Sequence, residues 1–408
     1  MLKKIYLFLF TIQAIGLFGQ NSNHLFRIRT ITAGVTLKSI SDTTTLLTAI
    51  DLLQKAKKEY ATKGYEIQTL RIATQNFYDY IGKYSYDEAL PFLEKLDAVV
   101  KRKGLILSIG QITPPDKNEP VIAEWAEKLI QRTSTISFSI SISSHQRGIH
   151  FNSIKAGAEI ISALSKHNGG EANFRFAASA NCPAGIPFFP AAFHEGKNSF
   201  AIGLEFPNLL TEAFKNANTT NARQVLKSVL EKNFIPVQQL AQSIAKKLQW
   251  QYDGIDASPA PGLDASIGEA IETYSKQPFG SPATLNACSL ITDVLKDLNI
   301  KKCGYSGLML PVIEDKVLAQ RATEGRFTLQ ELLLYSSVSG TGLDVVPLPG
   351  DTPQSVLENI LTDVAALSLK YTSKALSARL FLIPGKKAGD IATFENPYLT
   401  SSIVMKAY

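Results

Sequence analysis

The feature that most constrains the fold of this chain is a regular exchange between two hydrophobic periodicities. Residues 27–37 and 66–73 are rich in β-branched side chains, a composition typical of strands. Residues 43–60 and 86–100 place apolar side chains three and four positions apart, which is the spacing of a helix. Strands that alternate with helices predict βαβ units, and therefore a mostly parallel sheet with helical cover.

The alternation continues to the end of the chain. Further strands are predicted at residues 105–109, 133–143, 174–180, 200–206, 304–310 and 378–383. Further helices are predicted at residues 119–130, 152–166, 266–274, 284–295, 329–335 and 353–369, with two more before Trp250. No repeat, low-complexity run or Pro/Gly/Ser-rich linker divides the chain, so residues 25–408 are predicted to form a single α/β domain.

The strand at residues 133–143 alternates isoleucine and phenylalanine with serine. Its polar face carries Ser137, Ser139, Ser141 and Ser143. Serine occupies little volume and can satisfy its own hydroxyl, so this face suits the interior of a closed barrel. It suits equally an edge strand whose serines face water, and the periodicity does not separate the two arrangements.

The first residues have the pattern of a secretory signal peptide. Lys3 and Lys4 precede an apolar run at residues 5–12, and small residues suited to signal peptidase follow. We predict removal of residues 1–19 and export to the periplasm or the extracellular space. The apolar stretch is shorter than the ~20 residues that a membrane span needs, and no later segment is long and apolar enough. We therefore predict no membrane span after removal of the leader.

The charge composition argues against a nucleic-acid partner. The chain has 42 Lys and Arg against 36 Asp and Glu, and the resulting net charge of +6 is spread along the sequence. Nucleic-acid-binding proteins instead concentrate basic residues on one face. With 45% hydrophobic and 19% charged residues, the chain has the composition of a globular protein rather than a disordered one.

Several familiar chemistries are absent from the sequence. The three cysteines, Cys182, Cys288 and Cys303, lack C-x-x-C spacing, which excludes a disulfide-rich scaffold and a structural zinc cluster. One disulfide between two of them is left open. The chain has no G-x-G-x-x-G after a strand, no P-loop and no G-x-S-x-G elbow, so no nucleotide cofactor is predicted.

Four loops combine turn-forming residues with chemically functional side chains. In the first, residues 181–195, three prolines fix an extended path that places His194 next to Glu195. A histidine beside a carboxylate suits acid–base catalysis or metal binding. The alternative is a histidine that caps a turn or packs on Phe193.

The next two loops supply carboxylates. Residues 252–268 include Asp256, whose oxygens suit a hard cation or, equally, the cap of a helix. Residues 304–315 end in Glu314 and Asp315, which suit a cation or the positive end of a helix dipole.

The fourth loop, residues 336–352, is rich in glycine and carries two aspartates. Asp351 precedes Thr352 and Pro353, a good helix start that explains it without any chemistry. Asp344 has no such local role, and we therefore take it as a candidate functional residue.

Short motifs along most of the chain carry a resemblance to a known family. They lie at residues 27–34, 180–183, 192–194, 255–256, 260–261, 266–268, 306–307, 311, 314–315, 342–344 and 349–353. In these motifs the chain resembles the prokaryotic family called domain of unknown function 711, or uncharacterised protein family 0210. The resemblance implies a closed ten-stranded pyruvate formate-lyase-like α/β barrel around an inserted loop, with helices packed outside.

The glycyl radical of the pyruvate formate-lyase superfamily is not implied for this chain. Its radical enzymes carry an R-V-x-G-aromatic motif near the C-terminus, and residues 384–408 contain nothing like it. The resembling family itself has no established activity, so the resemblance informs the fold more than the function.

Our leading hypothesis is an exported enzyme of the hydrolase or lyase type that acts on a small polar molecule in the barrel pocket. The candidate catalytic residues are His194, Asp256 and Asp344; the candidate substrate-binding residues are Arg29, Asn181 and Ser306; and the candidate ligands of a divalent cation are Glu314 and Asp315. The competing hypothesis is a non-catalytic small-ligand-binding or sensor protein that uses the same pocket. The oligomeric state is left open.

Overall fold

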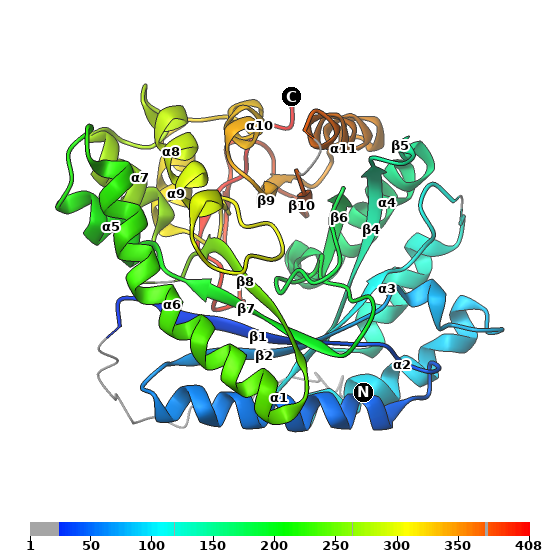
Figure 1. Ribbon diagram of the computed structural model, residues 1–408. Coiled ribbons are helices and arrows are strands. Elements are labelled where there is room, and N and C mark those ends of the chain that lie inside the picture. Colours follow the sequence, from blue (N-terminus) through cyan, green and yellow to red (C-terminus); the bar gives the residue numbers. More distant parts are fainter. Residues whose placement is uncertain (1–23, 118, 263, 372–373) are drawn as a thin grey trace, which may run out of the picture.

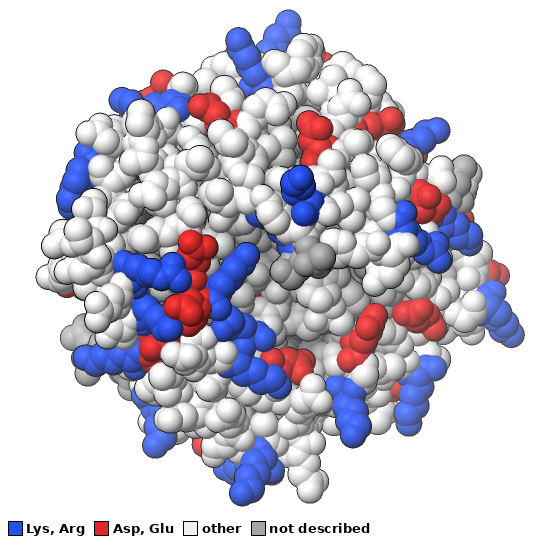
Figure 2. Space-filling view, turned by 45° about the horizontal axis from the view of Figure 1, so that its top comes forward, with Lys and Arg blue, Asp and Glu red and all other residues white. Residues whose placement is uncertain are grey.

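The computed structural model describes residues 24–117, 119–262, 264–371 and 374–408 (Figure 1). The signal peptide predicted at residues 1–19 lies outside these ranges. Among the described residues, no helix combines the length and the apolar character needed to cross a membrane. On the face seen in Figure 2, basic side chains are interspersed with acidic ones.

Within the described residues, the main sheet has ten strands and a central block of parallel neighbours. In spatial order, this block contains β1 (Arg27–Val35), β2 (Ile67–Thr74), β3 (Ile106–Gln111), β4 (Ile136–Ser144) and β6 (Phe176–Ala180). The short strand β5 (Gly148–Ile149) pairs only with β4. The predicted mixed α/β architecture with a mostly parallel sheet is confirmed.

Two parallel pairs of strands run in the opposite direction and flank this block. On one side, β7 (Ser199–Glu205) is antiparallel to β1 and parallel to β8 (Gln251–Ala260). On the other side, β10 (Leu376–Ile383) is antiparallel to β6 and parallel to β9 (Gly342–Pro349). A separate small sheet joins β11 (Ile391–Ala392) to β12 (Ser402–Ile403).

Helices surround the sheet; some pack directly on its strands, and others pack on neighbouring helices. They are α1 (Thr43–Thr62), α2 (Tyr86–Lys101), α3 (Ile122–Arg132), α4 (Phe151–Ser165), α5 (Pro207–Lys215), α6 (Ala222–Leu248), α7 (Ile267–Ser275), α8 (Thr284–Asp297), α9 (Lys316–Thr323), α10 (Leu329–Val338) and α11 (Gln354–Leu369), with short 3₁₀ turns at Phe77–Asp79 and Asn168–Arg175. Figure 1 shows α1 beneath β1 and β2, and α4 and α11 beside β4. The capping box of Ser85 with Glu88 illustrates how a helix start is fixed locally, here that of α2.

The closed barrel that we predicted is wrong, because the strand path is open between β8 and β9. The strand predicted at residues 304–310 lies between these two edges, and the segment around it forms one isolated bridge to each: Lys302 pairs with Ile255, and Pro311 pairs with Asp344. The backbone N–H groups of Tyr305 and Ser306 donate to the Asp256 carboxylate instead of to a neighbouring strand. A continuous ladder therefore does not form here. The kinship with pyruvate formate-lyase-like proteins stays a prediction.

The serine-rich strand β4 lies inside the sheet. It pairs with β3 on one side and β6 on the other, so the edge-strand alternative is wrong. Ser137, Ser139, Ser141 and Ser143 are all at most 7% exposed. The hydroxyls of Ser137 and Ser139 have no hydrogen-bond partner among the described residues.

Two strands occupy stretches that we predicted as loops. β8 contains Gly254 and Pro259, and β9 contains Pro347 and Pro349, residues that usually interrupt a strand. Both strands lie at an edge of the sheet, where a missing backbone donor is tolerated. Edge position therefore explains why these sequences form strands.

Candidate functional site

A cavity of about 230 Å³ lies among residues from both outer pairs and from the central block. β1 contributes Arg29, β2 contributes Arg71, β4 contributes Ser137, β9 contributes Asp344 and β10 contributes Arg379. Because side chains from strands far apart in the sheet order line one cavity, the sheet must curve around it. Its volume lies below the roughly 300–1,000 Å³ of drug-sized pockets, so it suits a small molecule.

The loop at residues 181–198 forms one wall of the cavity through Phe188, Phe189, Pro190 and Ala191. The sheet holds this loop by side-chain hydrogen bonds to its carbonyls, among them that of Ser108 Oγ to the Ala192 oxygen at 2.7 Å. Phe188 packs against Gly203 of β7, where an added Cβ would lie 2.7 Å from Phe188 Cζ. Because residue 203 has no side chain, the Phe188 ring of this wall can pack directly against the backbone of β7.

Opposite charges meet on one side of the cavity. Arg379 Nη1 donates to Asp344 Oδ1 at 3.0 Å and to Glu314 Oε2 at 3.4 Å. Arg29 Nη2 lies 3.9 Å from Glu314 Oε1, and Arg29 Nη1 donates to Glu205 Oε2 at 3.3 Å. Burial, opposed by Arg379 and reinforced by Glu314, raises the pKa of Asp344 to about 6. Asp344 can therefore exchange protons near neutral pH.

Arg71 brings a further positive charge to the cavity without a carboxylate of its own. The residue is 8% exposed, and its Nε lies 3.2 Å from Thr69 Oγ1. Among the described residues it forms no ion pair within 4.0 Å, although Glu314 acts on it through space. Burial, together with Arg29 and Arg379, lowers the pKa of Arg71 to about 9.

Aromatic rings orient these guanidinium groups. The Arg71 guanidinium carbon lies 5.1 Å from the ring centre of Phe189, that of Arg379 lies 4.8 Å from Phe174, and that of Arg29 lies 5.3 Å from Tyr398. Stacking on a ring face compensates part of the lost hydration while the N–H edges stay free to donate. The cavity therefore presents oriented donors to whatever occupies it.

Comparison with known proteins identifies a family whose match covers most of this chain. The family described as "Uncharacterised ACR (DUF711)" matches residues 21–395. The chain belongs to the DUF711 family. The match includes the charged residues of the cavity, from Arg29 to Arg379.

Individual relatives carry the name UPF0210 protein. That of Pyrobaculum islandicum is 27% identical over 382 residues, which cover 88% of this chain and 83% of the relative. That of Bifidobacterium longum subsp. infantis is 26% identical over 400 residues, 90% of this chain and 88% of the relative. That of Pyrobaculum aerophilum is 30% identical over 287 residues, 67% of this chain and 63% of the relative.

In this DUF711 protein, His194 lies apart from the charged cavity. Its ring packs on Gly34, where a Cβ would lie 2.2 Å from Nδ1, and it lines a separate space of about 10 Å³ with Ser199 and Asp253. Nδ1 is 3.5 Å from Ser199 Oγ, and Nε2 has no partner among the described residues. Burial lowers the pKa of His194. The two spaces share no lining residue, so the structure does not bring His194 to Asp344.

Asp256 and Asp315 hold the backbone of the DUF711 fold together. Asp256 accepts hydrogen bonds from the backbone of Ser258, Tyr305 and Ser306, and thus fastens β8 to the following segment. Asp315 accepts from Ile267 at the start of α7 and from residues 317 and 318 at the start of α9. Both carboxylates are fully buried, and neither lines the cavity. We therefore assign them structural roles.

The remaining predicted residues divide between the cavity and the framework. Arg29, Glu314 and Asp344 come together in the cavity. Asn181 donates through Nδ2 to the Lys374 oxygen at 3.5 Å, and Ser306 Oγ donates to the Cys303 oxygen at 2.9 Å; neither lines the cavity.

The predicted metal pair is not assembled. Asp315 turns toward two helix starts while Glu314 turns toward the arginines. In the ranges that the structure describes, no three His, Cys, Asp or Glu side chains are grouped to hold a metal ion. The cysteines at 182, 288 and 303 are all free, so none of them pairs in this structure.

Sequence reasoning missed Arg71 and Arg379. Each is a single charged residue inside an apolar strand, in the sequences TLRIAT and SARLFLI. A charge that interrupts a buried strand is costly unless it has a partner or a ligand, and this cost is the signal that identifies such positions.

Proposed function

We propose that the cavity binds a small anionic molecule and that Asp344, with Glu314 beside it, exchanges protons with it in a reaction of the hydrolase or lyase type. Arg71 carries this proposal. A buried guanidinium without a carboxylate partner is strongly unfavourable in the empty protein, and an anionic ligand would supply the missing charge.

The surrounding groups support the same proposal. Arg71 and Ser137 both line the cavity, and their side chains carry N–H and O–H donors of the kind that bind an oxyanion. On the other side, Asp344 has a pKa of about 6, near the value that favours acid–base catalysis at neutral pH. Arg379 already contacts both Glu314 and Asp344, so we assign these carboxylates to proton exchange rather than to a metal ion.

A binding assay on the purified mature protein tests the first half of the proposal. Thermal-shift measurements would use acetate, benzoate, succinate and inorganic phosphate as probes. We expect at least one probe to raise the melting temperature of the wild type and to have no effect on Arg71→Met. The matched control is Arg321→Met, which removes an arginine outside the cavity. No response to any anion, or a response that persists in Arg71→Met, would overturn the proposal.

Turnover separates an enzyme from the alternative, a binding or sensor protein. The bound probe and its relatives would be incubated with protein and followed by NMR. We expect turnover by the wild type and loss of turnover, with binding retained, in Asp344→Asn. Binding that is never followed by a chemical change would favour the sensor function. The proposed export to the periplasm or cell exterior would be tested by fractionating cells that express the full-length chain.

A further inference from the structure

A second, smaller space adjoins the cavity. It has a volume of about 100 Å³, and the residues that line it include Arg27, Gln68 and Asp264. The side chain of Asp264 is 65% exposed and that of Arg27 is 25% exposed, so this outer space lies toward the protein surface. In the cavity itself, Arg71 and Arg379 are each only 8% exposed. A ligand bound at Arg71 therefore lies deeper in the molecule than the outer space.

Of the residues that the structure describes, Arg29, Pro261, Glu314 and Tyr398 line both spaces and form the boundary between them. Tyr398 is the aromatic member of this group, and the centre of its ring lies 5.3 Å from the guanidinium carbon of Arg29. Tyr398 is 46% exposed and yet lines the cavity. This residue therefore stands between the cavity and solvent on the side of the outer space.

The backbone that carries the Tyr398 ring is fixed on both sides of that residue. The Tyr398 N–H donates to Asn396 Oδ1 at 3.0 Å, and the Asn396 N–H donates to the Glu171 carboxylate at 3.1 Å. After Tyr398, the Thr400 N–H donates to the Ile313 oxygen at 2.8 Å. None of these hydrogen bonds uses the side chain of Tyr398. The ring can therefore be removed while the backbone stays tied to the rest of the domain.

An apolar wall of the cavity leads to the same boundary. Phe188, Ala260 and Met309 pack in one buried cluster, and all three line the cavity. Pro261 follows Ala260 directly and lines both the cavity and the outer space. Burial of apolar surface against such a wall is favourable. A ligand held at Arg71 gains most from this wall if its apolar part extends toward the boundary.

We infer that the Tyr398 ring sets the upper length of the ligand by closing the apolar part of the cavity toward the outer space. This inference rests on the proposed function, because it takes Arg71 as the partner of the anionic group. It narrows the ligand to a short anion whose apolar body ends before Tyr398. Without the ring, a longer body would reach the outer space. Because Gln68 and Asp264 make that space polar, the added length should be tolerated there without strengthening the binding.

Straight-chain carboxylates of increasing length test this inference. Isothermal titration of the mature protein would compare the acids from acetate to dodecanoate. In the wild type, we expect the affinity to rise with length and then to fall at least tenfold at the first acid that is too long. In Tyr398→Ala, the affinity should fall less than threefold at that same acid. Tyr398→Leu, a milder truncation, should move the length limit in the same direction.

Two control variants keep the limit of the wild type. Tyr398→Phe retains the ring and loses only the hydroxyl group. Tyr408→Ala removes a tyrosine that is 86% exposed and does not line the cavity. A length limit that moves in either control would contradict the role that we give to the Tyr398 ring.

The outcomes separate this inference from the proposed function. If carboxylates bind but the length limit is the same in the wild type and in both truncated variants, the inference fails and the anion site stands. The same conclusion follows if the wild type shows no limit up to dodecanoate, because the apolar part then leaves the cavity by another route, such as past the exposed Ser134. It also follows if phosphate binds and no carboxylate does. If no anion binds, both claims fail.

Discussion

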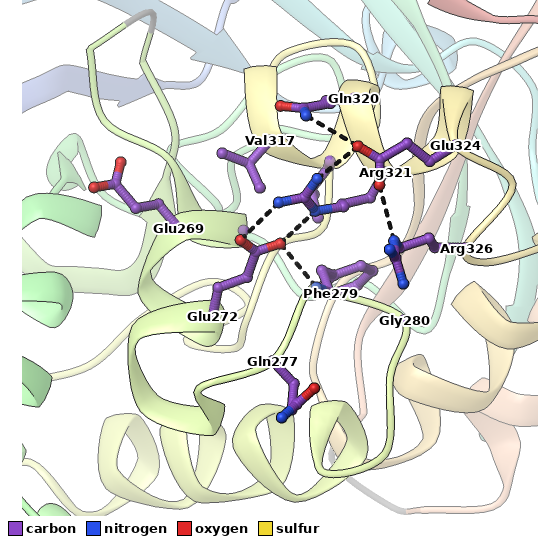
Figure 3. Close-up of polar contacts among 12 residues, drawn as sticks. Glu269, Glu272, Gln277, Phe279, Gly280, Val317, Gln320, Arg321, Glu324 and Arg326 are labelled. Atoms are coloured by element: carbon purple, nitrogen blue, oxygen red, sulfur yellow. Dashed lines mark hydrogen bonds and ion pairs between the residues drawn. The ribbon is translucent and has the colours of Figure 1, made fainter.

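Two networks of arginine and carboxylate side chains in this molecule differ in how exposed they are and in how completely their groups are paired. In the surface network of Figure 3, Arg321 of α9 donates to both oxygens of Glu272 of α7, at 2.6 and 3.0 Å, and to Glu324 at 2.7 Å. Glu324 also accepts from Arg326 at 2.8 Å, and Glu272 accepts from the Phe279 backbone at 2.8 Å. Every carboxylate oxygen drawn there for Glu272 and Glu324 has a donor.

The cavity network is buried more deeply and is less complete. Arg379, Glu314 and Asp344 have side chains that are 9–10% exposed, whereas Arg321 and Glu272 are 17% and 22% exposed. Arg379 Nε has no partner among the described residues, and Arg71 has no paired carboxylate. Water solvates and screens the charges of the first network, so burying them costs little free energy and their ion pairs add little to folding stability. The desolvation of the second network costs much more free energy. Because some of its buried charged groups lack partners, we interpret the cavity as a binding site.

The largest expected effect that separates the two networks is on stability. Arg379→Met leaves Glu314 and Asp344 buried without their shared donor, and we expect a loss of about 3–5 kcal/mol in the free energy of unfolding at pH 7. Urea unfolding would measure it, and part of the loss should be recovered at pH 5, where Asp344, whose pKa is raised to about 6, takes up a proton. A loss below about 1 kcal/mol would mean that the cavity network behaves like a surface network.

The pH dependence of stability gives the next largest effect. The pKa of Asp344 is raised to about 6 in the folded protein from an ordinary 3.8, so the folded state holds its proton more tightly than the unfolded state. This group therefore destabilises the protein above pH 6, and the penalty is relieved as the pH falls from 6 to 4. Relative to Asp344→Asn, the wild type should gain on the order of 2 kcal/mol between pH 7 and pH 4. Urea titrations at several pH values would check this, and parallel curves for the two proteins would contradict it.

Removal of Arg71 should separate binding from stability. We expect Arg71→Met to weaken binding of the responding ligand at least tenfold, which corresponds to about 1.4 kcal/mol. Its free energy of unfolding should stay the same or rise, because the variant no longer buries an unpaired cation. Titration calorimetry and urea unfolding give the two quantities. A strongly destabilised Arg71→Met would show that the arginine serves the fold instead.

The smallest expected effect belongs to the surface. Arg321→Met should cost at most about 1 kcal/mol, since exposed ion pairs contribute little, and the cost should shrink as salt is added. Urea unfolding at low and high ionic strength measures it. A loss as large as that of Arg379→Met would remove the contrast between the two networks.

The fold could be predicted where side-chain periodicity agrees with burial. The alternation of Ile and Ser in β4 identified a strand, but only its pairing with β3 and β6 shows that it is an inner strand whose serines are buried. β8 and β9 were missed because glycine and proline dominate the local pattern, and their edge positions are a tertiary property. Barrel closure was wrongly predicted because the sequence does not reveal that Asp256 takes the backbone donors of residues 305 and 306.

The candidate site was predictable only in part for a similar reason. Glu314 and Asp344 lie in or beside loops rich in turn residues, and the sequence analysis selected charged residues in such loops as candidates. Arg71 and Arg379 are each one charge in an apolar strand, and their approach to the same cavity depends on the curvature of the sheet. His194 and Glu195 are adjacent in sequence, yet the packing of the imidazole on Gly34 turns it into a different space.

The wall that residues 188–191 form has a practical consequence. These residues belong to no strand, so replacing their side chains alters the shape of the cavity while the hydrogen-bond ladders of the sheet stay intact. Libraries that randomise positions 188, 189 and 191, with glycine kept at 203, would therefore explore new molecular preferences on an unchanged scaffold. For the same reason, a few substitutions in this wall could change which small molecule the cavity binds during evolution.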